Sequence, residues 1–341
     1  MHIKPPLRKI IVSSASEMRC LFDKMNEMIN TISVLGPTAS GKTSLAIELA
    51  ARLDGEIISC DSMQLYKEMN IGTATPTESE QNGIKHHLLS IIEPEEEFSA
   101  ADYAALASDA IKDIASRGKV PILCGGTGMY HDAVMRIVSF TEGKQDDVLR
   151  EELYEYARIN GNEALHEKLR AIDPESADAI HPNNVKRVVR AIEVYETTGK
   201  TKTETDREQL SGEKKFNDCA FIIDFSDRQL LYDRINRRVD IMMEEGLERE
   251  ARSLLCTDRK ISRTAFQAIG YKEFLPYFNG EKKIDDVVED IKIATRHYAK
   301  RQLIWFRKDK ISDRIFADDG GNMKNTSCLA DEAMSVILEK R

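Results

Sequence analysis

Long hydrophobic runs are missing from this sequence. No apolar stretch approaches the roughly 18 residues that a membrane helix needs. Residues 1–30 also make a poor secretory signal, because acidic residues soon follow the short apolar core at Ile10–Val12. We therefore expect a cytoplasmic protein without membrane contact. At 341 residues, 41% of them hydrophobic, the chain is long enough for two domains with a sizeable core.

Paired cysteines and an excess of positive charge are missing too. The six cysteines are scattered, with no C-x-x-C pair and no histidine at zinc-ligand spacing, so we expect reduced, mostly structural thiols. The 49 basic residues against 58 acidic ones give a net charge of -9, which argues against indiscriminate nucleic-acid binding. The exception is Lys292 to Lys310, with seven basic residues and one acidic residue.

Short apolar runs alternate with helical patterns in the first part of the chain. Ile32–Leu35, Glu56–Cys60 and Val120–Cys124 are typical of buried strands. Helices are expected from Thr43 to about Arg52, and from an N-cap at Ser99 to Arg117. Such alternation predicts right-handed crossovers and a parallel sheet, with ligands at the carboxyl ends of the strands.

The pattern changes near residue 141, where polar helices with charged connections begin. It changes back at Phe221–Phe225, which is typical of a core strand. We predict an α/β fold with a P-loop NTPase-like parallel-sheet core, an inserted helical domain and C-terminal helices. The predicted parts are a poorly ordered leader (1–30), the core (31–140 and 217–310), the inserted domain (141–216) and a C-terminal tail (311–341).

A glycine-rich loop separates the first strand from the first helix and matches the pattern G-x-x-x-x-G-K-[ST]. Its backbone N–H groups, the helix dipole and a lysine together hold phosphate, and the hydroxyl of Thr43 can ligate Mg²⁺. The pattern does not identify the molecule that carries the phosphate, so ATP, GTP and a non-nucleotide diphosphate remain possible. The loop comprises Gly36, Pro37, Thr38, Ala39, Ser40, Gly41, Lys42 and Thr43.

Asp61 ends the second strand and is expected at the same edge of the sheet as the loop. Its carboxylate suits a general base that takes a proton from an attacking amine or hydroxyl. A loop cap or a ligand of Mg²⁺-bound water is the alternative. Ser62 and Gln64 follow it and could contact the polar edge of a substrate, and Thr127 follows the paired glycines after the third strand.

Six blocks follow one another along the chain: Gly36–Thr43, Asp61–Tyr66, Ile71–Ala74, His86–Leu88, Gly125–Tyr130 and Lys300–Arg307. Together they resemble the bacterial tRNA dimethylallyltransferases from about residue 31 to 309. The resemblance implies transfer of a dimethylallyl group from its diphosphate to N6 of adenosine 37 in tRNA, with Mg²⁺ as cofactor. It implies a prenyl diphosphate in the glycine-rich loop and the tRNA anticodon stem-loop as partner. We expect a monomer.

The resemblance also implies roles for individual residues. The implied catalytic residues are Asp61, Lys42, Thr127 and Arg238, and the implied metal ligands are Thr43 and Ser44. The implied tRNA-binding residues are Asp61, Ser62, Met63, Gln64, Arg150, Lys186, Arg187, Val188, Val189, Arg190, Gln267, Gly270, Tyr271, Lys272, Lys300, Arg301 and Arg307. Tyr271 and Trp305 could stack on bases, although single aromatic residues at helical spacing are more often core residues.

Two other classes of function fit parts of the sequence. A P-loop kinase would use Asp61 to activate a hydroxyl and residues 141–216 as a lid, but it leaves the basic C-terminal helices without a role. A non-catalytic RNA-binding module leaves the glycine-rich loop and Asp61 unexplained. His86 and His87 are not expected to form one site together, because adjacent residues of an extended segment point to opposite faces, although the family resemblance leaves room for a role of one of them.

Overall fold

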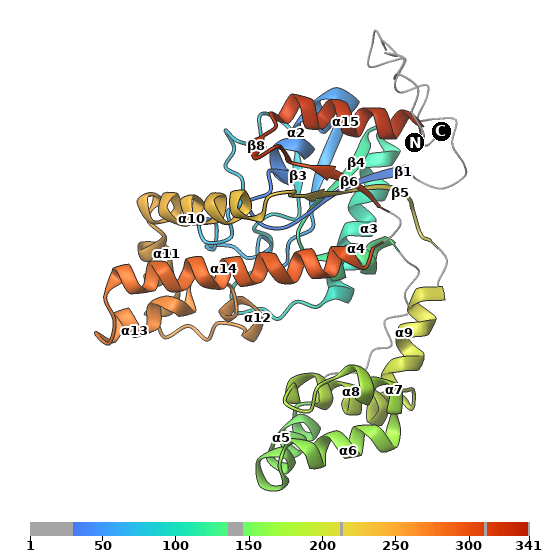
Figure 1. Ribbon diagram of the computed structural model, residues 1–341, viewed down its shortest axis with the longest axis vertical. Coiled ribbons are helices and arrows are strands. Elements are labelled where there is room, and N and C mark those ends of the chain that lie inside the picture. Colours follow the sequence, from blue (N-terminus) through green and yellow to red (C-terminus); the bar gives the residue numbers. More distant parts are fainter. Residues whose placement is uncertain (1–29, 136–145, 212–213, 310–311, 340–341) are drawn as a thin grey trace. The chain divides into compact units, whose positions relative to one another are not determined.

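The computed structural model describes residues 30–135, 146–211, 214–309 and 312–339 (Figure 1). The chain divides into two compact units, one formed by residues 1–135 with 216–341 and the other by 136–215. The leader predicted for residues 1–30 lies outside the described residues, apart from Asn30. Of the helices in these ranges, none has both the length and the apolar composition to cross a membrane.

Six parallel strands form the central sheet of the larger unit, in the order β3-β2-β4-β1-β5-β6 (Figure 1). This confirms the predicted α/β fold with a parallel sheet. The strands are β1 (Asn30–Leu35), β2 (Gly55–Ser59), β3 (His86–His87), β4 (Val120–Gly125), β5 (Asn217–Asp224) and β6 (Asp313–Phe316).

Helices α2 (Lys42–Leu53) and α14 (Ile284–Arg307) cover opposite faces of this sheet, which explains why β1 carries apolar residues on both sides. Helix α3 (Ala100–Ser116) begins at a capping box, in which Ser99 and Asp102 each accept the other's backbone N–H. The remaining elements of the larger unit are α4 (Gly128–Met135), α10 (Arg228–Glu245), α11 (Leu247–Leu255), α12 (Arg263–Phe266), η1 (Lys272–Phe274), α13 (Leu275–Phe278), β7 (Asp318–Asp319), β8 (Asn322–Met323) and α15 (Thr326–Glu339).

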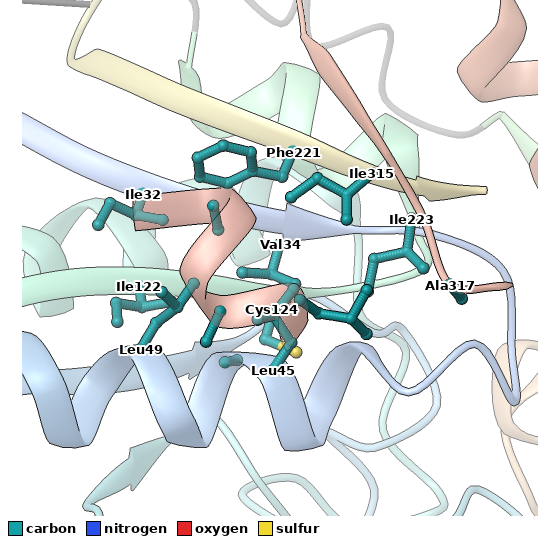
Figure 2. Close-up of a cluster of buried hydrophobic side chains, with 14 of the residues drawn as sticks. Ile32, Val34, Leu45, Leu49, Ile122, Cys124, Phe221, Ile223, Ile315 and Ala317 are labelled. Atoms are coloured by element: carbon teal, nitrogen blue, oxygen red, sulfur yellow. The ribbon is translucent and has the colours of Figure 1, made fainter. Parts of the chain in front are cut away.

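Alternate residues of the strands face two different cores. Val34 of β1 packs with Leu45 and Leu49 of α2 on one face (Figure 2). Leu35, the next residue of β1, packs on the other face against Phe306 of α14. The glycine-rich loop therefore begins directly after a strand whose two faces are both packed against helices.

The C-terminal segment differs from the predicted tail. Strand β6 pairs with β5 and extends the sheet, and α15 packs on the face that α2 covers. Ile315 and Ala317 are the buried apolar residues of the range 313–319, so strand β6 has too few apolar residues to be recognised from its sequence. Where the sequence predicts a C-terminal tail, β6 and α15 join the sheet and core of the larger unit.

The smaller unit consists of helices with a core of their own. Leu165 and Leu169 of α6 pack with Val188 and Ile192 of α8. Its helices are α5 (Asp147–Asn160), α6 (Asn162–Ile172), α7 (Pro174–Ala179), α8 (Val185–Thr198) and α9 (Lys202–Ser211).

A buried histidine joins three elements of the larger unit. His131 of α4 donates from Nε2 to Asp218 Oδ2 of β5 at 2.9 Å. Thr31 and Ser33 of β1 donate to Oδ1 of the same carboxylate, at 2.9 and 2.8 Å. Asp132 Oδ1 lies 3.8 Å from His131 Nδ1. Burial opposes protonation of this histidine, but interactions with Asp132 and Asp218 outweigh it and raise the pKa of His131 to about 9.

This histidine is expected to make the stability of the protein depend on pH. A pKa raised from 6.5 to about 9 stabilises the fold fully below pH 6.5 and progressively less as the pH rises to 9. His131→Gln should lack this pH-dependent stabilisation. The free energy of unfolding of the parent should therefore exceed that of the variant by up to roughly 3 kcal/mol more at pH 6.5 than at pH 9. Urea titrations at several pH values measure it. His297→Gln, at an exposed histidine of α14, is the control; a pH slope unchanged by His131→Gln would contradict the assignment.

Candidate active site

The glycine-rich loop follows the carboxyl end of β1. This strand lies between β4 and β5 in the sheet. Gly41 has φ of 90°, a left-handed conformation that glycine adopts without strain, and α2 begins at the next residue. The positive end of the α2 dipole therefore points into the loop and favours an anion there. The Ser40 hydroxyl is buried and lacks a hydrogen-bond partner among the described residues, so a donor is free for phosphate.

Lys42 and Arg238 lie beside this loop and have no carboxylate ion-pair partner within the described ranges. Lys42 Nζ donates to Pro37 O at 3.2 Å. Burial lowers the pKa of Lys42, Cys124 and Asp61 oppose the shift, and the nearby Arg238 adds to it. Burial also lowers the pKa of Arg238, with Asp61 as the main opposing charge. The charge of these two poorly solvated cations exceeds that of Asp61, the carboxylate that acts on both, and a diphosphate would neutralise the excess.

Asp61 and Thr127 follow neighbouring strands, β2 and β4, and are linked by hydrogen bonds. Asp61 Oδ1 accepts the N–H of Met63 at 3.0 Å. Thr127 Oγ1 accepts the N–H of Ser62 at 3.2 Å, and the Thr127 N–H donates to Cys60 O at 3.2 Å. The segment that carries the Asp61 carboxylate is therefore fixed on both sides of Asp61.

A cavity of about 340 Å³ joins these groups. This volume lies in the range of small-molecule sites. Its polar lining includes the loop residue Thr38, Asp61, Arg238 of α10, and Tyr298 and Arg301 of α14. Its apolar lining comes largely from the same two helices and includes Ile235, Val239, Met242 and Ile291. The cavity thus places an anion site, a carboxylate and an apolar surface around one ligand-sized volume.

Arg234 lies one helical turn before Arg238 on α10, and the family resemblance that indicates Arg238 includes it. It donates from Nε to Ala39 O of the loop at 2.8 Å. Other residues at this site were not among those predicted from the sequence. Tyr298 lines the cavity, and burial raises its pKa above the usual value. Gln302 and Glu250 contact the loops around the cavity, and nothing in their local sequence indicates this.

Glu250 of α11 holds the loop that contributes Gly72, Thr73 and Ala74 to the cavity wall. Its carboxylate accepts the backbone N–H groups of Asn70, Ile71 and Gly72 at 2.9 to 3.1 Å. It also accepts the Tyr271 hydroxyl at 2.8 Å. A single carboxylate thus satisfies four donors and anchors this side of the cavity.

Replacing this carboxylate with an amide should loosen the cavity wall. Glu250→Gln keeps only one acceptor oxygen for the four donors, so the free energy of unfolding should fall by about 1 to 3 kcal/mol. The KM of the reaction at this cavity should rise. Thermal unfolding and steady-state kinetics measure the two effects. Glu248→Gln, which loses only an exposed ion pair with Arg252 on the same helix, is the control. Equal effects of both changes would show that Glu250 does not anchor the cavity wall.

The predicted tRNA-binding residues of the larger unit divide by exposure. Gln267, Lys272, Lys300, Arg301 and Arg307 are exposed. Tyr271 is fully buried and donates to Glu250, so its side chain has no surface with which to contact a base. Trp305 is 44% exposed, more than expected for a core residue. Gly270 is buried beside Tyr271 and, like Gln267, lines the cavity.

In the smaller unit, Lys186 and Arg187 of α8 are exposed, whereas Val188 and Val189 belong to the core. The amphipathic period of α8 turns those two valines inward, so their predicted contact with tRNA is not available to their side chains. Arg150 and Arg190 are half-buried and bind the fully buried Glu193 at 2.9 and 2.7 Å. Both arginines therefore stabilise the unit, with one positive charge in excess of the carboxylate.

The histidines His86 and His87 lie away from this cavity, on β3 at the edge of the sheet. His87 Nε2 is 2.8 Å from Glu56, and His86 Nδ1 is 2.8 Å from Ile84 O. Burial lowers the pKa of His86. The two side chains have separate partners, in agreement with the expectation that they do not form one site.

Comparison with known proteins identifies the family. Residues 64–309 match the family model described as IPP transferase. A tRNA dimethylallyltransferase from Acetivibrio thermocellus is 50% identical over 281 residues, which cover 82% of this chain and 90% of that relative.

Solved structures agree with this result. The tRNA isopentenylpyrophosphate transferase of Staphylococcus epidermidis has a TM-score of 0.66 at 38% identity and covers 92% of this chain and 99% of its own. A eukaryotic dimethylallyltransferase, described as acting on tRNA, has a TM-score of 0.76 at 31% identity and covers 92% of this chain and 80% of its own. The kinase and the non-catalytic module gain no support from these relatives. The chain belongs to the IPP transferase family of tRNA dimethylallyltransferases.

Proposed function

We propose that this chain transfers the dimethylallyl group of dimethylallyl diphosphate to N6 of adenosine 37 in tRNA and releases pyrophosphate. The observation that carries the proposal is the cavity in which Arg238 and the glycine-rich loop face Asp61 beside an apolar wall. An allylic diphosphate needs this combination, because its C–O bond ionises readily once the leaving group is neutralised.

The diphosphate would lie in the glycine-rich loop. The Ser40 hydroxyl and the α2 N-terminus supply donors, and Lys42 and Arg238 supply charge that protein carboxylates leave unpaired. Since charge develops on the diphosphate as the C–O bond breaks, these groups stabilise the transition state more than the ground state. The dimethylallyl group would contact Ile235, Val239 and other apolar residues of the wall.

The adenine amine would approach from the side of Asp61. As N6 forms its bond to C1 of the dimethylallyl group, the C1–O bond breaks and the electron pair leaves with pyrophosphate. The amine then carries an extra proton, which the Asp61 carboxylate accepts. Thr127 supports this step, because its hydroxyl holds the Ser62 N–H next to Asp61 at 3.2 Å.

The loop also suits the predicted Mg²⁺. The described residues contain no group of three His, Cys, Asp or Glu side chains that could hold a metal alone. Mg²⁺ commonly keeps few protein ligands and binds substrate phosphates and waters, and when bound it would neutralise charge on the leaving group. The Thr43 hydroxyl, on the second residue of α2 and next to Lys42, would ligate the ion. Ser44 is exposed and fits less well.

The tRNA would be held by exposed basic side chains near the cavity. Lys300, Arg301 and Arg307 of α14 and Lys272 are exposed, and Lys272 and Arg301 also line the cavity. In the smaller unit, Lys186 and Arg187 offer a second basic surface. Phosphate contacts of this kind position a nucleic acid without reading its sequence.

The proposal is tested by incubating the protein with dimethylallyl diphosphate, Mg²⁺ and unmodified tRNA. Nucleoside mass spectrometry should detect N6-prenylated adenosine, and tRNA in which guanosine replaces adenosine 37 should give none. Omission of Mg²⁺ should slow the reaction strongly. Absence of product together with robust ATP turnover would overturn the proposal.

A further inference from the structure

One buried amide joins the two loops at the carboxyl end of the sheet. Gln302 of α14 is 5% exposed. Its Oε1 accepts the backbone N–H of Thr38 at 2.9 Å, and its Nε2 donates to Gly126 O at 3.0 Å. Thr38 belongs to the glycine-rich loop, and Gly126 belongs to the turn between β4 and α4.

This amide has one possible orientation. Thr38 offers a donor and Gly126 offers an acceptor, so exchange of the amide oxygen and nitrogen would break both hydrogen bonds. The contact is also close, because a Cβ at Gly126 would lie 2.1 Å from Gln302 Nε2. The backbone of Gly126 therefore approaches the side chain to a distance that only glycine permits.

The two loops carry opposite halves of the reaction. The glycine-rich loop contains Thr38, which lines the cavity, and Lys42, which would bind the leaving diphosphate. The other turn continues from Gly126 into Thr127, whose hydroxyl holds Ser62 beside Asp61. The side-chain oxygen of Gln302 thus contacts the loop that would bind the diphosphate, and its side-chain nitrogen contacts the turn that leads to Thr127.

We propose that Gln302 is a positioning residue that sets the spacing between the diphosphate cradle and Asp61. This inference rests on the proposed function. Transfer requires the dimethylallyl carbon to lie between the breaking C–O bond and the attacking nitrogen, and a misplacement of about 1 Å can cost roughly a hundredfold in rate. The N–H of Thr38 is consequently a structural donor of the loop, already engaged by Gln302, and does not bind phosphate.

The test compares Gln302→Glu with Gln302→Met. The carboxylate keeps the acceptor for Thr38 but faces Gly126 O without a proton, whereas methionine keeps the length and loses both hydrogen bonds. We expect kcat for tRNA prenylation to fall about 10- to 100-fold in both variants near pH 8. The dissociation constant for tRNA should change by less than about threefold in both variants, and so should that for pyrophosphate in Gln302→Met, which adds no charge beside the loop.

The pH dependence of the activity distinguishes a positioning role of Gln302 from a general loss of folded protein. A buried carboxyl beside a carbonyl oxygen binds a proton more readily, and the protonated form can donate to Gly126 again. The activity of Gln302→Glu relative to the parent should therefore rise as the pH falls from about 8 to about 6, and that of Gln302→Met should not. Asp61, Arg238, Arg301 and Tyr298 line the same cavity in all three proteins, and Lys42 lies near Asp61 and Arg238, so pH effects from these groups cancel in the ratio to first order.

Gln229→Glu, at an exposed glutamine of α10, is the control for the added charge and should leave kcat unchanged. A kcat within about twofold of the parent in both Gln302 variants would overturn the inference, as would a loss fully explained by a smaller folded fraction in thermal unfolding. If the parent itself forms no prenylated adenosine, the proposed function fails. An active parent with fully active variants overturns only the role of Gln302.

Discussion

Replacing Asp61 with asparagine should lower kcat for tRNA prenylation by roughly 10²- to 10⁴-fold, which is the usual contribution of a general base. Asparagine keeps an oxygen at the position of Oδ1, so it can still accept the N–H of Met63 that Asp61 accepts at 3.0 Å. The loop is therefore expected to keep its shape, and the loss should come from the missing proton acceptor.

Single-turnover rates and tRNA binding, measured on the same preparation, separate chemistry from binding. The dissociation constant for tRNA should stay within about threefold of the parent. Asp109→Asn removes an exposed carboxylate of α3 and is the matched control. A kcat unchanged by Asp61→Asn would leave Asp61 with a purely structural role as the cap of Met63.

Lys42→Met should be the second most damaging change. Lys42 supplies positive charge beside the glycine-rich loop that no carboxylate of the described residues pairs, and its burial makes each contact with a phosphate stronger than in water. We expect kcat to fall by roughly 10²- to 10³-fold, as on removal of one preorganised donor to a developing anion. The KM for dimethylallyl diphosphate should rise as well.

Calorimetry with inorganic pyrophosphate tests this site without the reaction. Lys42→Met should bind pyrophosphate at least about tenfold more weakly and should bind tRNA like the parent. Lys112→Met, at an exposed lysine of α3, is the control. Normal affinity for pyrophosphate in Lys42→Met would place the leaving group elsewhere in the cavity.

The elements that the sequence predicts well are those with a local cause. The strand before the glycine-rich loop, the helix after it and the cap at Ser99 follow from runs and spacings within a few residues. By contrast, β6 was missed because two inward residues do not make a recognisable strand, and the full burial of Tyr271 could not be decided from its local sequence. A motif match gives a residue's place in the chain and not its exposure.

By itself, the sequence determined the chemistry available to this protein: a phosphate loop, a carboxylate at the end of the next strand, and basic residues along a late helix. The reaction that combines them was inferred from the resemblance to one family. Only the tertiary structure decided which side chains hold the loops around the cavity in place. Gln302 reaches Thr38 across 264 positions, and Glu250 reaches Ile71 across 179. Such contacts leave no local pattern, because they depend on how α11 and α14 pack against the loops at the end of the sheet.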